Sequence, residues 1–341
     1  MTEGAEARII PLHGRDRQAQ PEPPARSTGA AAEPTDTVLP LPQRPAAADE
    51  AEHLLGAESL PEALVRALEF VRNRLTGDYP VDEFGFDPEL TEMLLLPPLR
   101  LLYRKWFRVS THGVHNLPLD GGALVVCNHS GVLPLDSLMT ALAVHDEHPH
   151  RRYLRMLGAD LVFRTPMLGA LARKSGQTLA CNPDAERLLR SGELVGVWPE
   201  GFKGVGKPFS SRYKLQRFGR GGFVSAALRT GVPIVPCSIV GAEEIYPKIG
   251  DIKPLARLFG LPYFPVTPFF PLLGPLGAIP LPTKWQIEFG EPISTAELAT
   301  EDLAAEAAED PMLVFNLTDQ VRESIQQALY RRLAQRTGVF R

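Results

Sequence analysis

The sequence lacks the features of disulfide-rich, metal-binding and nucleic-acid-binding proteins. Only three of its 341 residues are cysteines (Cys127, Cys181 and Cys237), and they do not have the spacing of metal ligands. This odd, small number suits a reducing compartment, and Cys127 and Cys237 lie in apolar runs where a buried thiol is expected. The formal net charge of -4 lacks the positive excess with which general nucleic-acid binders displace counterions. We therefore expect no bound metal and no nucleic-acid partner.

Signals for export and for membrane insertion are also missing. Residues 1–10 include acidic residues and contain no apolar segment of the kind found in signal peptides. The longest uncharged run, residues 258–283, is apolar but contains seven prolines, which prevent the internal hydrogen bonding of a spanning helix. We therefore expect a cytoplasmic protein that is at most peripheral on a membrane.

The chain divides into two regions of different composition. Residues 1–50 are rich in Ala, Pro, Glu and Gln with few aromatics, which predicts a disordered tail. Residues 51–341 are predicted to form a single domain, whose first part, residues 51–110, is a helical lead. Its helices are expected at residues 59–77, 87–96 and 99–107, with an interruption at Pro97-Pro98.

Residues 111–341 alternate between strand-like and helical patterns. Strands are expected at residues 123–127, 193–198, 233–240 and 285–289. Helices are expected at residues 137–144, 184–190 and 222–229, and a long final helix from residue 310 onward. This alternation favours an α/β fold with a largely parallel central sheet flanked by helices.

The strongest candidate for chemistry is the segment Val125–Asp136, in which a strand ends, a polar turn carries His129 and a helix begins near Asp136. Sites in α/β folds lie beyond the carboxyl ends of the strands. A histidine beside a carboxylate is a good general base for a hydroxyl. The residues alone leave two simpler alternatives open, namely that Asp136 caps the helix and that His129 is a turn residue.

A second motif, Trp198 to Lys203, follows another apolar strand. From Lys203 to Arg220 there are six cationic residues and no acidic one. Such a cationic loop fits a substrate phosphate or the headgroups of anionic lipids. A solvated basic loop explains the pattern equally well.

Three other patterns do not support a function. Residues 201–207 match a P-loop up to its eighth position, where Pro208 has no hydroxyl for magnesium. The histidines within residues 145–150 lack the spacing of a metal site, and their neighbours predict an exposed loop. Ser130 is a weak nucleophile candidate because Asn128 stands where a nucleophile elbow needs glycine.

Three motifs occur in the order found in the glycerolipid acyltransferases, which include the lysophosphatidic acid acyltransferases. They are Asn-His and Asp within residues 128–136, Trp-Pro-Glu-Gly at 198–201, and Val-Pro-Ile-Val-Pro at 232–236. The chain resembles this family over roughly residues 99–292. The resemblance implies an O-acyltransferase that uses acyl-coenzyme A or an acylated carrier protein as co-substrate and needs no other cofactor.

The resemblance places the family's histidine and aspartate on His129 and Asp136, but two departures matter. The family motif has four residues between them, whereas here six intervene. Asn182 stands where the family often has an arginine, and before Pro183 it is expected to cap a helix. The missing arginine weakens the inference of a phosphorylated acceptor, for which Arg164 is a candidate replacement.

The resemblance further implies direct acyl transfer, in which His129 takes the proton of an acceptor hydroxyl and Asp136 orients the imidazole. Backbone amides near Ser130 and Gly131 are expected to hold the oxyanion. The residues expected to contact substrate are Asn128, Ser130, Gly131, Arg164, Pro199, Glu200, Gly201, Lys203 and Lys207. The expected acceptor is a lysophospholipid such as lysophosphatidic acid. Alternatives are a neutral acceptor such as diacylglycerol, a thioester hydrolase, and a non-catalytic lipid-binding protein.

Substrates of this kind reside in membranes, so a membrane surface is an expected partner. Residues 94–107 combine apolar residues with several basic ones, which is typical of an interfacial helix. The proline-rich residues 258–282 are expected to form a loop that shields the acyl chain or touches lipid. Core packing is the alternative for both segments.

Overall fold

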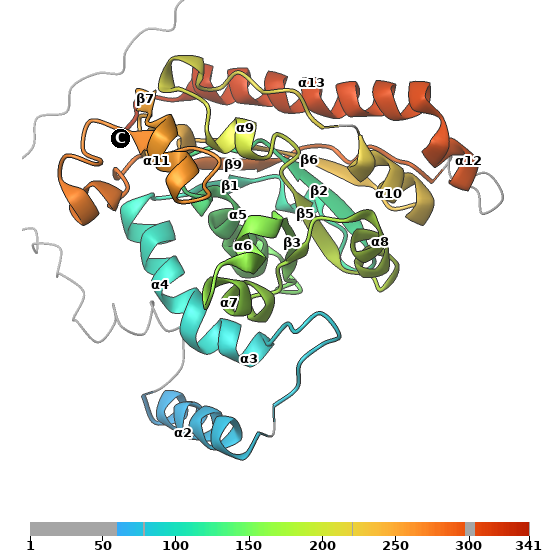
Figure 1. Cartoon of the computed structure of the whole chain (residues 1–341). Helices are drawn as coiled ribbons and strands as arrows, with labels where there is room; N and C mark the ends of the chain where they lie inside the picture. Colours follow the sequence, from blue (N-terminus) through green and yellow to red (C-terminus); the bar gives the residue numbers. More distant parts are fainter. Residues whose placement is uncertain (1–59, 78, 220, 297–303, 341) are drawn as a thin grey trace, which may run out of the picture. The chain divides into compact units, whose positions relative to one another are not determined.

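The computed structural model of the chain describes residues 60–77, 79–219, 221–296 and 304–340. The predicted disordered tail lies outside these residues. Within them, a central sheet is covered by helices on both faces (Figure 1).

The central sheet has seven strands in the order β1-β9-β6-β2-β5-β3-β4. Their bounds are β1 Ser110–His112, β2 Ala123–Cys127, β3 Leu154–Gly158, β4 Thr178–Leu179, β5 Leu194–Val197, β6 Ile234–Val240 and β9 Gln286–Phe289. All neighbouring strands pair in parallel except β6 and β9, which are antiparallel. The prediction of an α/β fold with a largely parallel sheet is therefore confirmed.

Two hydrophobic clusters pack against the opposite faces of this sheet. Alternate residues of β2 contribute to each, with Val125 and Cys127 in one cluster and Leu124 and Val126 in the other. This two-sided burial explains why the central strands read as continuous apolar runs. Both Cys127 and Cys237 are fully buried, as expected.

Four helices form most of the two covering layers. They are α5 (Leu135–Glu147) on one face and α8 (Asn182–Arg190), α10 (Gly222–Thr230) and α13 (Pro311–Gln335) on the other. The side chain of Asp310 caps α13 by accepting hydrogen bonds from the amides of Met312 and Leu313. The expected Asn182 cap is not formed, because α8 begins at Asn182 and Cys181 occupies the cap position.

The helical lead consists of α2 (Leu60–Thr76) and one continuous helical run from Pro88 to Trp106. The run is made of α3 (Pro88–Leu90), a π-helical turn (Thr91–Leu95), α4 (Leu96–Leu101) and a second π-helical turn (Leu102–Trp106). The predicted interruption at Pro97-Pro98 is therefore wrong. The two prolines lie in the first turn of α4, directly after a π-helical turn, where a missing amide hydrogen costs little.

Shorter elements complete the described part of the chain. The helices are α6 (Asp160–Arg164), α7 (Leu168–Lys174), α9 (Phe202–Val205), α11 (Lys253–Leu258) and α12 (Ala304–Glu309), and a small antiparallel sheet joins β7 (Gly250–Asp251) to β8 (Pro265–Val266). Turns of 3-10 helix lie at Val114–Asn116, Phe209–Ser211, Ala242–Glu244 and Gly274–Ala278. No helix in these residues is both long and apolar enough to cross a bilayer.

A polar cluster fastens the helical lead to α5. His145 lies between two carboxylates, with Nδ1 3.1 Å from Asp146 and Nε2 3.3 Å from Glu92, and Asp146 also accepts a two-pronged bond from Arg100. The predicted exposed loop of histidines is confirmed for His150, which is exposed, and is wrong for His145 and His148, which are each only 2% exposed. Among the described residues no group of three or more His, Cys, Asp or Glu could hold a metal ion.

The charges of this cluster predict how it responds to pH. The hydrogen bond from His145 holds the pKa of Glu92 down at about 2. Burial lowers the pKa of His145, but the bonds to Asp146 and Glu92 outweigh it and raise this pKa above its ordinary value. The contribution of Glu92 to the free energy of unfolding is therefore complete above about pH 4.5 and is lost on acidification. The contribution of His145 is complete below about pH 6.5 and is lost as the pH rises.

Replacing Glu92 by Gln should lower the free energy of unfolding by about 1 kcal/mol near pH 6, since this half-exposed carboxylate is partly screened. The difference from wild type should shrink as the pH falls to about 3, where the unfolded carboxyl is protonated. Urea unfolding at both pH values measures it. Glu69→Gln, which alters an exposed carboxylate on α2, is the control. A difference independent of pH would show that the ion pair contributes nothing.

Candidate active site

His129 lies at the carboxyl end of β2, in the turn that leads to α5. The preceding Asn128 is fully buried, and its amide pairs with the main chain of Ile239: Nδ2 donates to the carbonyl at 3.0 Å, and Oδ1 accepts from the amide at 2.7 Å. Asn128 therefore locks β2 to β6 where the turn begins. The contact with substrate expected for Asn128 is not supported, because the side chain is fully buried and both of its polar atoms bond to Ile239.

The imidazole of His129 is held by a buried carboxylate. Nδ1 of His129 lies 2.8 Å from Oδ2 of Asp136, which also accepts the amide of Ser130 at 2.8 Å, while Oδ1 accepts the amide of Ser137. The six intervening residues thus bring the pair together despite the wider spacing. Asp136 is not the helix cap, because α5 begins at Leu135. Its position in the first turn lets the helix dipole stabilise the charge.

A second buried carboxylate, Glu200, positions the main chain of the same turn. Oε1 of Glu200 accepts the amide of His129 at 2.9 Å, and Oε2 accepts the amide of Gln216 at 2.6 Å. Glu200 is only 3% exposed. The Pro-Glu-Gly motif therefore joins the His129 turn to the cationic loop. The two carboxylate oxygens of Glu200 fix the main chain of both segments. Pro199 takes part through its carbonyl, which accepts the amide of Gly219.

Two glycines after Glu200 are required by backbone geometry. Gly201 has a φ of +53° and a ψ of -143°, a conformation that other residues rarely adopt. Gly204 lies against His129, and a Cβ atom there would be 2.6 Å from Cβ of Glu200 and 2.8 Å from the carbonyl oxygen of His129. Gly204 was not identified from the sequence, although it follows the recognised motif closely.

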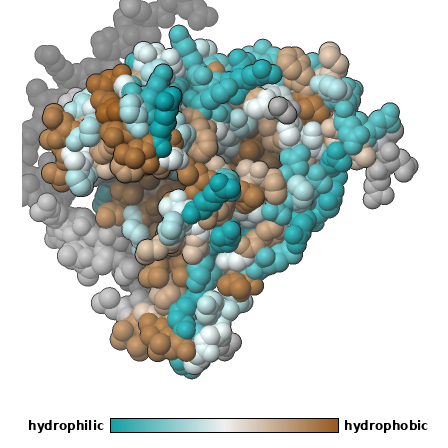
Figure 2. All heavy atoms as spheres, in the orientation of Figure 1, coloured by the Kyte–Doolittle hydropathy of each residue, from teal (hydrophilic) through white to brown (hydrophobic). Residues whose placement is uncertain are grey.

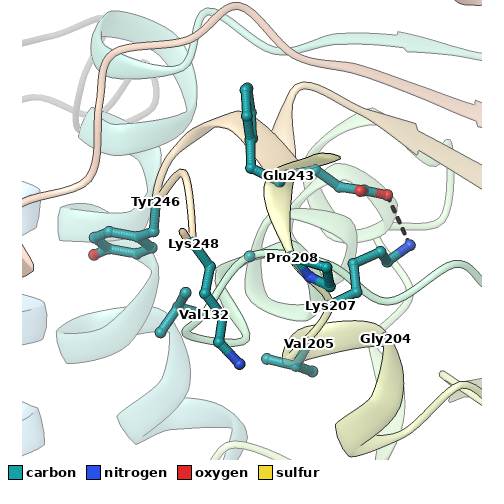
Figure 3. Close-up of a pocket in the computed structure, with 10 residues that line it drawn as sticks. Val132, Gly204, Val205, Lys207, Pro208, Glu243, Tyr246 and Lys248 are labelled. Atoms are coloured by element: carbon teal, nitrogen blue, oxygen red, sulfur yellow. Dashed lines mark hydrogen bonds and ion pairs between the residues drawn. The ribbon is translucent and has the colours of Figure 1, made fainter. Parts of the chain in front are cut away.

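The ammonium group of Lys207 points away from the open site. It lies 3.0 Å from Oε1 of Glu243 (Figure 3). It also lies 3.5 Å from Oε2 of Glu200 and donates to the carbonyl of Lys214. Because Lys207 is 8% exposed and its three protons have acceptors, the expected contact with a headgroup is not available to it. Burial raises the pKa of Glu243 to about 7, although Lys207 opposes this.

A small pocket adjoins the turn after His129, between Gly131, Val132 and Gly204 (Figure 3). Lys248 lies in it, with its ammonium donating to the carbonyl of Gly206 and 4.5 Å from the ring centre of Tyr263. Neither Glu243 nor Lys248 was identified from the sequence. Glu243 could have been identified, because the acidic pair Glu243-Glu244 comes shortly after the end of β6, at the same edge of the sheet as His129.

Two of the predicted contacts, Lys203 and Arg164, lie on the surface. Arg217 of the cationic loop, which was not among the predicted contacts, is also exposed, so Lys203 and Arg217 are both open to a headgroup. Arg164 is exposed on α6 and pairs with Asp160 of the same helix at 2.8 Å. No contact recorded for the described residues connects Arg164 with His129.

A larger apolar cavity runs along α5 and was not predicted. Its volume is about 250 Å³, and it is lined by α5 together with the helical lead, β3 and α7. Leu138 and Ala141 line it from α5, the helix whose first turn carries Asp136. Its polar groups include His145 and Tyr153.

The chain is similar to several known proteins. A family model described as acyltransferase matches residues 108–240. An uncharacterized protein of Mycobacterium tuberculosis is 64% identical over 271 residues, which are 80% of this chain and 74% of that protein. The chain belongs to the glycerolipid acyltransferase family. The match to the acyltransferase model confirms both the resemblance inferred from the motifs and the enzyme class, O-acyltransferase.

Two more distant matches have names that state an activity. A human protein named DGAT1/2-independent enzyme synthesizing storage lipids is 26% identical over 234 residues, 67% of each chain. The crystal structure of the 1-acyl-sn-glycerophosphate (LPA) acyltransferase PlsC from Thermotoga maritima has a TM-score of 0.47 and 18% identity. It covers 74% of this chain and 83% of its own.

Replacing Gly204 by Ala should disturb His129 directly, because the new Cβ would clash with its carbonyl and with Glu200. We expect a fall of about 1–3 kcal/mol in the free energy of unfolding and a loss of about tenfold or more in kcat. Release of thiol from an acyl thioester measures the rate. The matched control is Gly219→Ala, since a Cβ atom there meets nothing within 4 Å. Equal rates in both variants would rule out a positioning role for Gly204.

Proposed function

We propose that this acyltransferase moves a fatty acyl group from an acyl thioester to a hydroxyl of a lysophospholipid, with His129 as general base. The observation that carries the proposal is the 2.8 Å contact between Nδ1 of His129 and Oδ2 of Asp136. A carboxylate can only accept, so Nδ1 donates and Nε2 keeps the lone pair that a base needs. Nε2 has no protein partner within the described residues, and the ring is 14% exposed.

The reaction proceeds by direct transfer. Nε2 of His129 takes the proton of the acceptor hydroxyl while the hydroxyl oxygen forms a bond to the carbonyl carbon of the thioester. The carbonyl oxygen becomes an oxyanion, and its collapse breaks the bond between carbon and sulfur. The imidazolium then returns the proton to the leaving thiolate, so the products are an ester and a free thiol. Asp136 stabilises the imidazolium between these steps.

An amide of the His129 turn is the proposed oxyanion donor. The amide of Ser130 cannot serve, because it donates to Asp136. The amide of Gly131 is the next along the turn and has no acceptor in the part of the chain that the structure describes. We assign the oxyanion contact to Gly131 rather than to both residues.

Two cationic side chains support a phosphorylated acceptor. Lys203 and Arg217 are exposed on segments close in sequence to Glu200 and to its partner Gln216, and they suit a phosphate better than the buried Lys207. A neutral acceptor such as diacylglycerol is the second candidate. It is favoured by Asn182 in place of the family's arginine and by the storage lipids in the human relative's name.

The acyl chain is assigned to the apolar cavity along α5. The cavity is lined mostly by aliphatic side chains, which suit a fatty chain and offer few groups to a polar ligand. α5 carries Asp136 in its first turn, and its residues Leu138 and Ala141 line the cavity wall. This one rigid helix would therefore fix the position of the acyl chain relative to the proposed base.

Replacing His129 by Ala should lower kcat about a hundredfold to ten-thousandfold, because the base is lost. Asp136→Asn should have a comparable effect, since the amide has no charge to stabilise the imidazolium, and its NH2 group would face a donor where one carboxylate oxygen now accepts. The assay measures thiol release from a long-chain acyl-coenzyme A, with lysophosphatidic acid, other lysophospholipids and diacylglycerol offered separately.

The choice of acceptor separates the alternatives in this assay. Release that needs a lysophospholipid supports the proposal, release that needs diacylglycerol supports the neutral acceptor, and release without any acceptor identifies a hydrolase. Full activity of folded His129→Ala would exclude the proposed base. Circular dichroism provides the control for folding.

Replacing Ala141 by Trp should shorten the acyl chains that the enzyme accepts, because the indole would fill part of the cavity. We expect kcat/KM for long-chain thioesters to fall about tenfold or more, with little change for short ones. The control is Ala170→Trp, which places the same side chain on the exposed face of α7. An unchanged chain-length profile in the Ala141 variant would exclude the cavity as the acyl site.

A further inference from the structure

Residues 253–282, here called the proline-rich lobe, expose an unusual amount of apolar surface. The exposed fractions are 84% for Leu272, 73% for Leu258 and 67% for Leu276. Phe259, Leu261, Phe269, Leu273 and Ile279 are also exposed. Hydrophobic side chains gather over this segment at the upper left of Figure 2, where Figure 1 shows it in orange. A soluble surface rarely gathers so many large apolar side chains without a partner.

The charges of the lobe select the kind of partner. The lobe itself has two cations, Lys253 and Arg257, and no acidic residue. The adjoining Asp251 accepts the amide of Phe264 and lies 3.8 Å from the ammonium of Lys248. Lys253 and Arg257 are both exposed on α11, beside Leu258 and Phe259. Apolar side chains flanked by cations without anions match the surface of an anionic phospholipid bilayer. By contrast, the exposed apolar row of α2 is interspersed with both acidic and basic residues.

The lobe is also joined to the catalytic turn. The hydroxyl of Tyr263 donates to the carbonyl of Val132 at 2.7 Å, three residues beyond His129. The hydroxyl of Tyr246 donates to the carbonyl of Ala278 at 2.5 Å, and Trp106 donates through its indole to the carbonyl of Pro280 at 3.0 Å. The lobe thus forms a bridge between the His129 turn and the end of the helical lead.

We propose that the outer face of the proline-rich lobe is the docking surface for an anionic phospholipid membrane. Docking there would present the His129 turn to acceptors that remain in the lipid. The proposal rests on the function proposed above, since it names the surface from which that site takes its lipid substrate. It also makes the enzyme peripheral, held by inserted side chains and by cations near the headgroups.

The test compares vesicle binding of the full chain and two charge-bearing variants. Leu272→Glu/Leu276→Glu should weaken binding to vesicles of phosphatidylcholine with phosphatidylglycerol about a hundredfold, since two exposed leucines would no longer insert. The matched control is Met312→Glu/Phe315→Glu, which alters two residues of similar exposure at the far end of α13 (Figure 1). Cosedimentation measures binding, and circular dichroism checks the fold.

A third variant tests the role of charge. Lys253→Gln/Arg257→Gln should reduce the preference for phosphatidylglycerol over pure phosphatidylcholine about tenfold. The same samples are assayed for thiol release with acceptor in vesicles and with acceptor dispersed in detergent. The lobe variant should lose activity only on vesicles, because its catalytic residues are intact.

The outcomes distinguish the two proposals. Equal vesicle binding by the wild type and the lobe variant, or no binding by the wild type, would overturn the docking surface. Loss of binding in the lobe variant but not in the α13 control would support it. Binding needs no turnover, so a protein that binds through the lobe but never releases thiol would refute the proposed function and leave the docking surface standing.

Discussion

The carboxylate of Asp136 is the group on which the geometry of the candidate active site depends. It is fully buried, and three donors surround it: the ring of His129 and the amides of Ser130 and Ser137. A buried charge is tolerated only when it is fully hydrogen-bonded, so each donor must be in place for the others to hold. The end of β2, the turn and the start of α5 are therefore fixed by a single group, which also selects the tautomer of His129.

A second ionic group holds the same turn from the opposite side. Glu200 accepts the main-chain amide of His129, and through Lys207 it is linked to Glu243 and so to the end of β6. Such buried ion pairs give little net stability, because desolvation offsets their attraction. Their value here is positional. Asp136 sets the plane of the imidazole and Glu200 sets the backbone beneath it, so the proposed base is defined in both orientation and place.

The sequence predicts the central strands and the contact between His129 and Asp136, and specific physical causes explain what it misses. β2 is predicted with its observed bounds because burial on both faces makes it apolar throughout. β3 is missed because it contains Arg155, a charge buried by pairing with Asp82 and Glu193. Lys207 is misread because composition cannot distinguish an exposed ammonium from one that is enclosed by carboxylates.

The same limit applies to distance along the chain. Six residues between His129 and Asp136 look too many for the family motif, yet the turn absorbs the extra length. Its carbonyl at Val132 accepts the hydroxyl of Tyr263, from a segment more than a hundred residues away, and its carbonyl at Pro134 accepts the hydroxyl of Ser137. A longer turn would by itself lose more conformational entropy on folding. The bond from the proline-rich lobe offsets that cost, so the lobe that exposes the apolar surface also supports the turn that carries His129.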